Sequence, residues 1–146
     1  MLKPGLLQQQ TASSVASVWA RSDPSAALAW VDGFPQGEPR SNAMRNVVVS
    51  WCGQDPDTAT DWVLRQTADA SRDELLDLLA SNQRYQDAKL AIRLGEQIGD
   101  ADRRNRSLQQ TVQQWIRQDT DAARAWVQRS SLPDDMKRAL LSTQRQ

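Results

Sequence analysis

The sequence has no histidine and only one cysteine in 146 residues. Histidine is the commonest general base and the commonest metal ligand, so its absence removes the usual centres of acid–base catalysis and metal binding. The single Cys52 cannot form a disulfide within the chain, and its place beside Trp51 is typical of a small buried residue. These absences favour a non-enzymatic protein that uses no cofactor and no metal.

Long apolar runs are also missing. No segment approaches the roughly 20 apolar residues that span a bilayer, which predicts no membrane insertion. The chain carries 18 basic and 18 acidic residues. This balance gives no overall attraction to nucleic acid, so no nucleic-acid partner is expected. Residues 1–5 carry no signal-peptide core. Whether a leader has been removed is a question that the sequence leaves open, and the compartment is undetermined.

What the chain does have is a set of residues that recur at intervals of 32 positions. Such a fixed period is the mark of a repeat array. There are three such series: Trp19, Trp51 and Trp115, with Gln83 at the remaining position; Trp30, Trp62 and Trp126, with Leu94 at the remaining position; and Asp23, Asp55, Asp87 and Asp119.

Each repeat is predicted to contain a short helix A and a longer helix B. Asp23-Pro24 is a favoured helix start, because aspartate caps the first turn and proline fits the first helical position. The residues from Gly33 to Gly37 interrupt the helix, which predicts helix A over 24–32 and helix B over 39–52. Gly53 is expected to end helix B. In later repeats we expect Ser71 and Glu74 to form a capping box, and Gly99 to end helix A.

The predicted fold class is all-α, an α-solenoid of about nine helices in a single domain over residues 1–146. Stacked repeats bury a continuous core that one helix pair cannot bury alone. We expect the six tryptophans to supply much of that core, since each hides roughly 150–250 Å² when buried. The predicted units are a half repeat over 6–20 and repeats over 23–52, 55–84, 87–116 and 119–146.

Two further series accompany the tryptophans. Small residues at Ala27, Ala59, Ala91 and Ala123 would let helix A approach its neighbours closely. Arginines recur at Arg40, Arg72 and Arg104. They have two open interpretations: they pair with carboxylates of the adjacent repeat, or they form a row of solvated side chains.

The stretch Trp19-x-x-x-Asp23-Pro24-x-Ala26-Ala27-x-x-Trp30, followed by Pro35-x-Gly37 and Arg40, resembles a known type of repeat. It is similar to the tryptophan- and Asp-Pro-marked α-solenoid repeats of bacterial proteins, which are grouped with HEAT-like and TPR-like helical repeats. The resemblance implies a right-handed stack of helix pairs and implies no activity. A TPR repeat has 34 residues rather than 32, so its peptide-carboxylate contacts are not carried over.

Known catalytic motifs are absent from the sequence, including the phosphate-binding loop, the nucleophile elbow and the HExxH zinc motif. Asp55, Asp57 and Asp61 lack the glycine and the terminal glutamate of a calcium loop, so capping by Asp55 explains the group better. Asp73 and Asp77 fall near the start of a helix B, where the helix dipole favours acidic residues.

The third repeat departs most from the pattern and is the place to look for a binding site. The basic group Arg103, Arg104 and Arg106 is expected at the break before its helix B, as a contact for a phosphate or an acidic partner. The alternative is a solvated loop offset by Asp100 and Asp102. The candidate binding residues are Arg84, Tyr85, Lys89, Arg93, Arg103, Arg104 and Arg106.

The sequence therefore predicts a non-enzymatic scaffold that binds a protein or peptide partner on the concave face of a solenoid. The alternative is a helical accessory domain of a longer envelope or secreted enzyme, suggested by the half repeat at the start. Leu140 and Leu141 would lack a following repeat to cover them. The terminal helices are therefore a candidate homodimer interface.

Overall fold

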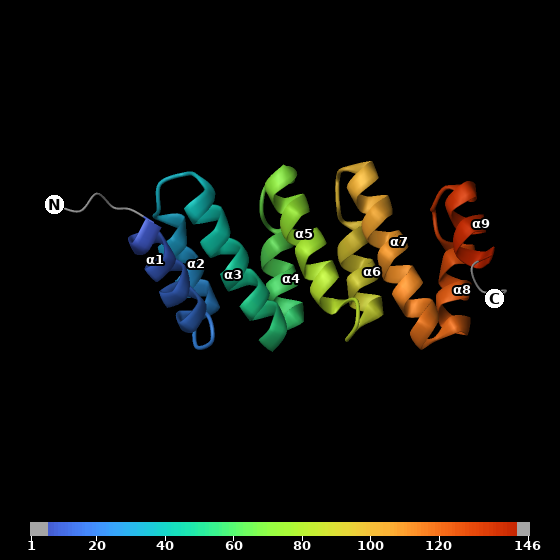
Figure 1. The fold of residues 1–146 in the computed structure, drawn as a ribbon, viewed down its shortest axis with the longest axis horizontal. Helices are drawn as coiled ribbons and strands as arrows, with labels where there is room; N and C mark the ends of the chain where they lie inside the picture. Colours follow the sequence, from blue (N-terminus) through green and yellow to red (C-terminus); the bar gives the residue numbers. More distant parts are fainter. Residues whose placement is uncertain (1–5, 143–146) are drawn as a thin grey trace. The chain divides into compact units, whose positions relative to one another are not determined.

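A computed structural model describes the backbone of residues 6–142 and the side chains of residue 11 and residues 14–142. These residues form nine α-helices and no strand, which confirms the all-α class (Figure 1). No helix in the described part of the chain is long and apolar enough to cross a membrane. The helices are α1 (Leu6–Trp19), α2 (Pro24–Asp32), α3 (Glu38–Gln54), α4 (Pro56–Leu64), α5 (Ala70–Gln83), α6 (Ala88–Glu96), α7 (Ala101–Gln118), α8 (Thr120–Arg129) and α9 (Asp134–Ser142).

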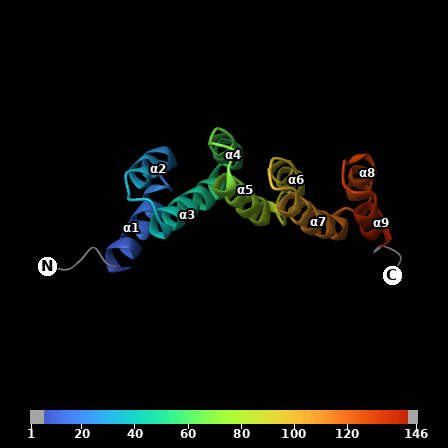
Figure 2. The ribbon, with the colours of Figure 1, turned by 90° about the horizontal axis from the view of Figure 1, so that it is seen from above.

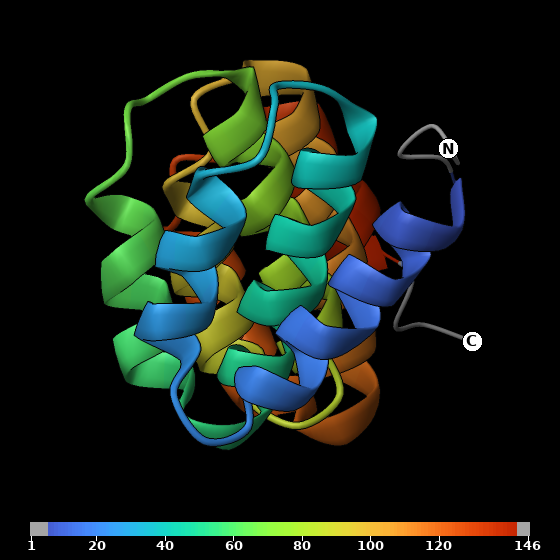
Figure 3. The same cartoon turned by 90° about the vertical axis from the view of Figure 1, so that its left-hand side faces the viewer.

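The chain divides into two compact units, and the boundary falls inside α4, after Trp62. In the first unit, α1, α2 and α3 all pack against one another. The turn between α1 and α2 lies at one end of these helices, and the loop between α2 and α3 lies at the other (Figure 3). Ala27, Val31, Val47 and Val48 are fully buried in this unit.

In the second unit, each helix from α5 to α9 packs against the next helix in the sequence. The contacts of α7 extend further, to α5 and to α9. Seen along the helices, α6 and α8 lie in one layer and α5, α7 and α9 lie in the other (Figure 2). The apolar core of α6 to α9 consists of Ala88, Ile92, Leu108, Val112, Trp115, Ala123, Val127, Leu132 and Leu140.

The four aspartates of the 32-residue series occupy turns of one geometry, in which a helix B is followed directly by a helix A. Their φ and ψ angles are −148° and 84° at Asp23, −144° and 84° at Asp55, −143° and 87° at Asp87, and −148° and 88° at Asp119. The capping role predicted from the sequence is confirmed, because each carboxylate accepts a hydrogen bond from the backbone N–H three residues later.

The same turns are fixed on their other side by the preceding helix. The backbone N–H of each aspartate donates to the carbonyl four residues before it, and that residue belongs to the first tryptophan series. The donor–acceptor distances are 2.9 Å from Asp23 to Trp19, and 2.7 Å from Asp55 to Trp51, from Asp87 to Gln83 and from Asp119 to Trp115. The aspartate therefore joins the end of one helix to the start of the next.

Helix boundaries in the first complete repeat follow the sequence signals. The predicted helix over 24–32 is α2, and the predicted helix over 39–52 is α3 with slightly longer ends. Gly37 lies just before α3 with a φ of 148°, a conformation that glycine adopts without strain. The alanine series is also as expected, since Ala27, Ala59, Ala91 and Ala123 are all fully buried.

Two glycines do not end helices as predicted. Gly53 lies inside α3, because the hydrogen-bonding pattern continues until the N–H of Asp55 donates to Trp51. Helix α6 ends at Glu96 rather than at Gly99. The helix stops there because the backbone N–H of the next residue, Gln97, donates to the carbonyls of Leu94 and Gly95.

The expected capping box of Ser71 and Glu74 is also wrong. The N-cap of α5 is Asp69, whose carboxylate accepts from the backbone N–H of Arg72 at 2.9 Å. Asp69 precedes the helix by the required spacing and is among the best capping residues. Ser71 consequently lies within the first turn of α5.

The prediction that all six tryptophans belong to the core is only partly right. Trp51 and Trp115 are each 8% exposed, whereas Trp19 is 37% exposed and Trp30 is 38% exposed. Trp62 and Trp126 are half-buried. A helical stripe predicts which side of a helix faces its neighbours, but the size of an indole leaves part of the ring in water where few helices surround it.

Tryptophans of the two series contact each other in the first unit. The ring centroids of Trp19 and Trp30 are 5.9 Å apart, and those of Trp51 and Trp62 are 6.4 Å apart. The indole N–H of Trp51 also donates to the hydroxyl of Thr58 at 2.9 Å. These aromatic pairs connect each helix B to the helix A that follows it.

The uncovered end predicted at Leu140 is wrong. Leu140 is only 1% exposed and belongs to the apolar core of the second unit. Leu141 is half-buried and packs against the same core. Helix α9 folds back against α7 as well as α8, which covers these side chains. A homodimer through the terminal helices therefore has no exposed Leu140 to support it. Gln146, the end of the predicted fourth repeat, lies outside the described residues.

We predict that Trp115→Ala lowers the free energy of unfolding by about 3–5 kcal/mol, because it opens a cavity among buried residues. Trp126→Ala should cost about half as much, because its ring is already partly in water. Urea unfolding followed by circular dichroism measures both. Equal losses for the two variants would contradict the burial described above.

Candidate functional site

The seven candidate residues do not form a single cluster. Arg84 follows α5 and joins it to α7, because its guanidinium donates to Gln110 at 3.1 Å and to Thr111 at 3.4 Å. The ring of Tyr85 is 65% exposed, while its backbone carbonyl accepts from the side chain of Gln118. Both residues therefore hold the α5–α6 turn against α7, and only the Tyr85 ring faces solvent.

The basic group Arg103, Arg104 and Arg106 lies within the first two turns of α7, not in the break before it as predicted. Arg103 pairs with Asp77 of α5 at 3.5 Å. The guanidinium of Arg106 is 3.4 Å from the carbonyl of Asp102. The cap of α7 is Asp100, which precedes the group and starts the helix earlier than expected.

The arginine series follows neither of the two interpretations left open by the sequence. Each arginine reaches back to the end of the helix A that precedes its own helix B, where cations favourably meet the negative end of the helix dipole. Arg40 pairs with Asp32, Arg72 donates to the carbonyl of Leu64 at 3.4 Å, and Arg104 donates to the carbonyl of Ile98 at 3.1 Å. The series therefore holds the two helices of each pair together.

Asp73 is a buried carboxylate in the first turn of α5 that holds the loop between α6 and α7. It is 8% exposed, and its two oxygens accept from the backbone N–H groups of Gly99 at 2.8 Å and Asp100 at 3.0 Å. A Cβ at Gly99 would lie 3.4 Å from this carboxylate, so the absence of a side chain there permits the close approach. The residue is structural, since both acceptors are already engaged.

Two open pockets of the second unit share Trp126 in their linings. The first, which we call the apolar pocket, has a volume of about 480 Å³. The second, which we call the polar pocket, has a volume of about 320 Å³. Because Trp126 lines both, a ligand that covers this ring can enter the two pockets together.

The apolar pocket has an aromatic and aliphatic lining with charged residues around it. Leu90, Ile92, Trp115 and Trp126 provide apolar surface. The charged residues that line it are Asp87, Lys89 and Arg93. Lys89 and Arg93 are exposed and lie four residues apart on α6, so their side chains share one side of the helix.

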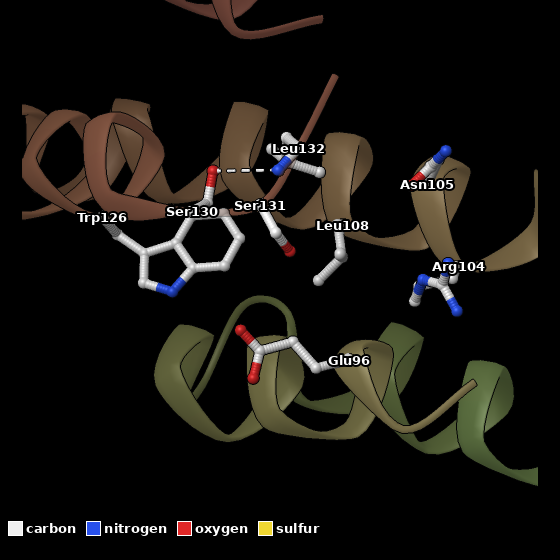
Figure 4. Close-up of a pocket in the computed structure, with 8 residues that line it drawn as sticks. All are labelled: Glu96, Arg104, Asn105, Leu108, Trp126, Ser130, Ser131 and Leu132. Atoms are coloured by element: carbon white, nitrogen blue, oxygen red, sulfur yellow. Dashed lines mark hydrogen bonds between the residues drawn. The ribbon is translucent and has the colours of Figure 1, made fainter. Parts of the chain in front are cut away.

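The polar pocket is drawn in Figure 4. Glu96 of α6 extends from the wall opposite Trp126 and Ser131, and its carboxylate points into the space between them (Figure 4). Arg104 and Leu108 of α7 line the same pocket. The hydroxyl of Ser130 is engaged within the chain, because it donates to the carbonyl of Val127 at 2.7 Å.

Of the candidate residues, the structure therefore brings Lys89 and Arg93 to the apolar pocket and Arg104 to the polar pocket. Trp126, which the sequence predicts to lie in the core, and Glu96, which no sequence pattern marks, also line the pockets. The sequence did mark the third repeat as divergent, since Leu94 replaces a tryptophan and Gly95 replaces a valine of the neighbouring repeats, but neither residue lines the apolar or the polar pocket.

Within the described residues, no group of three or more cysteines or acidic residues could hold a metal ion. Comparisons with protein families, with curated proteins and with solved structures found no match for this chain.

We predict that Asp73→Ala lowers the free energy of unfolding by about 1.5–3 kcal/mol, because two backbone N–H groups lose a charged acceptor. The matched control is Glu74→Ala on the same helix, where an exposed side chain is removed and the change should stay within about 0.5 kcal/mol. Urea unfolding measures both. A loss at Asp73 no larger than at Glu74 would show that the carboxylate is dispensable.

Proposed function

We propose that this protein is a non-enzymatic helical repeat scaffold that binds a protein or peptide segment. The observation that carries the proposal is the half-buried Trp126, which lines two pockets. Tryptophan is among the side chains enriched in the residues that dominate binding energy at protein interfaces. A peptide that crosses the ring can place side chains in both pockets.

The open form of the pockets favours a peptide over a small molecule. Small ligands are usually held in enclosed clefts that bury most of their surface. Here the same aromatic ring borders two neighbouring hollows, and backbone or side-chain groups of an extended segment can follow that surface. The lack of histidine and of catalytic motifs in the sequence supports a binding role without chemistry.

We propose further that the 32-residue units stack as a right-handed α-solenoid in one domain over residues 1–146. Two observations support this arrangement. The four aspartate turns share one backbone geometry. Within each unit, helices pack against neighbours in the sequence, which is how repeat proteins are organised. In such an array, one divergent repeat can carry the binding site while the others support it.

The test is selection from a displayed library of random 12-residue peptides. We expect the unmodified protein to enrich peptides that bind it directly in a purified system. Trp126→Leu should weaken these peptides by about tenfold or more, as expected for the loss of a central aromatic residue. Leucine is the residue that the third repeat already has at this position, Leu94, so the variant should fold.

Trp30→Leu is the matched control, because Trp30 belongs to the same series and is also partly exposed, but lies in the other unit. Its affinity for the selected peptides should match that of the unmodified protein. If no peptide is enriched, or if Trp126→Leu binds as well as the control, the proposed function is wrong.

A further inference from the structure

The charges beside the apolar pocket are inverted relative to the neighbouring repeats. Lys89 stands where the repeats on either side have Asp57 and Asp121. Arg93 stands where they have Asp61 and Ala125. Lys89 and Arg93 both line the pocket. The change therefore gives this hollow a cationic edge that the series does not provide elsewhere.

The apolar floor and the cationic edge lie together on one ligand-sized surface. Leu90 and Ile92 are each 3% exposed, so the floor is fixed by packing in the core. Asp87 is the acidic residue of the lining, and its carboxylate already accepts from the N–H of Leu90 at 3.0 Å. Asp87, Lys89 and Arg93 all occupy exposed positions, so the two cations outnumber the one carboxylate of the lining.

We propose that the apolar pocket binds an extended acidic peptide segment, in which an apolar side chain enters beside Trp126 and flanking carboxylates pair with Lys89 and Arg93. This inference rests on the proposed function and names the chemical class of its partner. Pairing between a basic patch and an acidic segment raises the association rate and selects the partner, while the apolar side chain supplies most of the affinity.

The polar pocket decides between a peptide and a nucleic acid. A single-stranded nucleic acid could also stack on Trp126 and pair its phosphates with the two cations. The adjoining pocket presents the carboxylate of Glu96 as well as the guanidinium of Arg104 (Figure 4). A strand that is anionic throughout is repelled by Glu96, whereas a peptide can place a neutral or basic residue at that point. A peptide of mixed charge is therefore favoured over a nucleic acid.

The experiment restores the acidic residues of the preceding repeat at both positions. The variant is Lys89→Asp with Arg93→Asp, which copies Asp57 and Asp61. Lys89 lies in the first turn of α6, where an acidic residue suits the helix dipole. Arg93 lies in the last turn, where an aspartate is less favourable, but α4 already carries Asp61 at the same place, so folding should be retained and is checked by thermal melting. The control, Arg21→Asp with Arg124→Asp, makes the same change in net charge at exposed positions outside both pockets.

We expect the unmodified protein to select 12-residue peptides that carry at least two acidic residues around an apolar one. The selected peptides should bind the Lys89→Asp/Arg93→Asp variant at least about tenfold more weakly, and bind the control within about twofold. Their affinity for the unmodified protein should also fall as salt rises from about 0.05 to 0.5 M, because the pairs are at the surface.

The possible failures are distinguishable. Enriched peptides without an acidic bias, or acidic peptides that bind the reversed variant unchanged, would overturn this inference and leave the scaffold function standing. Tighter binding of a random-sequence 12-nucleotide RNA than of any selected peptide would overturn it in favour of a nucleic-acid site. Failure to enrich any peptide would overturn both proposals.

Discussion

The aspartate turn is the interaction on which the rest of the structure depends. Its N–H continues the hydrogen bonding of the helix before it, and its carboxylate caps the helix after it. One residue therefore satisfies backbone groups at two helix ends, where exposed N–H and carbonyl groups would otherwise need water. The turn also fixes the direction of the second helix, so the apolar stripes of both helices face the same neighbours.

The third repeat shows how the aspartate turns accommodate a repeat whose residues differ from those of its neighbours. Gly95 replaces valine, and a Cβ added there would lie only 2.9 Å from Leu108. The absence of that side chain lets α6 approach α7 closely. Leu94 takes the place of a tryptophan and is fully buried. The exposed side of α6 carries Lys89 and Arg93. The carboxylate of Asp87 caps the start of this helix and so holds it in position.

Helix positions could be predicted from the sequence because their causes are local. An aspartate followed by proline specifies the start of a helix without any knowledge of its neighbours, as Asp23 does. The burial of Trp30 could not be predicted in this way, because it depends on how many helices surround the ring. The pockets needed the same tertiary information. Arg40, Arg72 and Arg104 recur in the sequence, but their contacts with the preceding helix ends follow only from three-dimensional packing.

The central claim is that a peptide binds across Trp126. The six tryptophans offer a direct test, because each indole N–H gives its own signal in a nitrogen–proton NMR spectrum. During titration with a selected acidic peptide, the account predicts that the signals of Trp126 and Trp115 shift. The signals of Trp19 and Trp30, which are more exposed than Trp115, should stay in place. Shifts at Trp19 and Trp30 without a shift at Trp126 would contradict it.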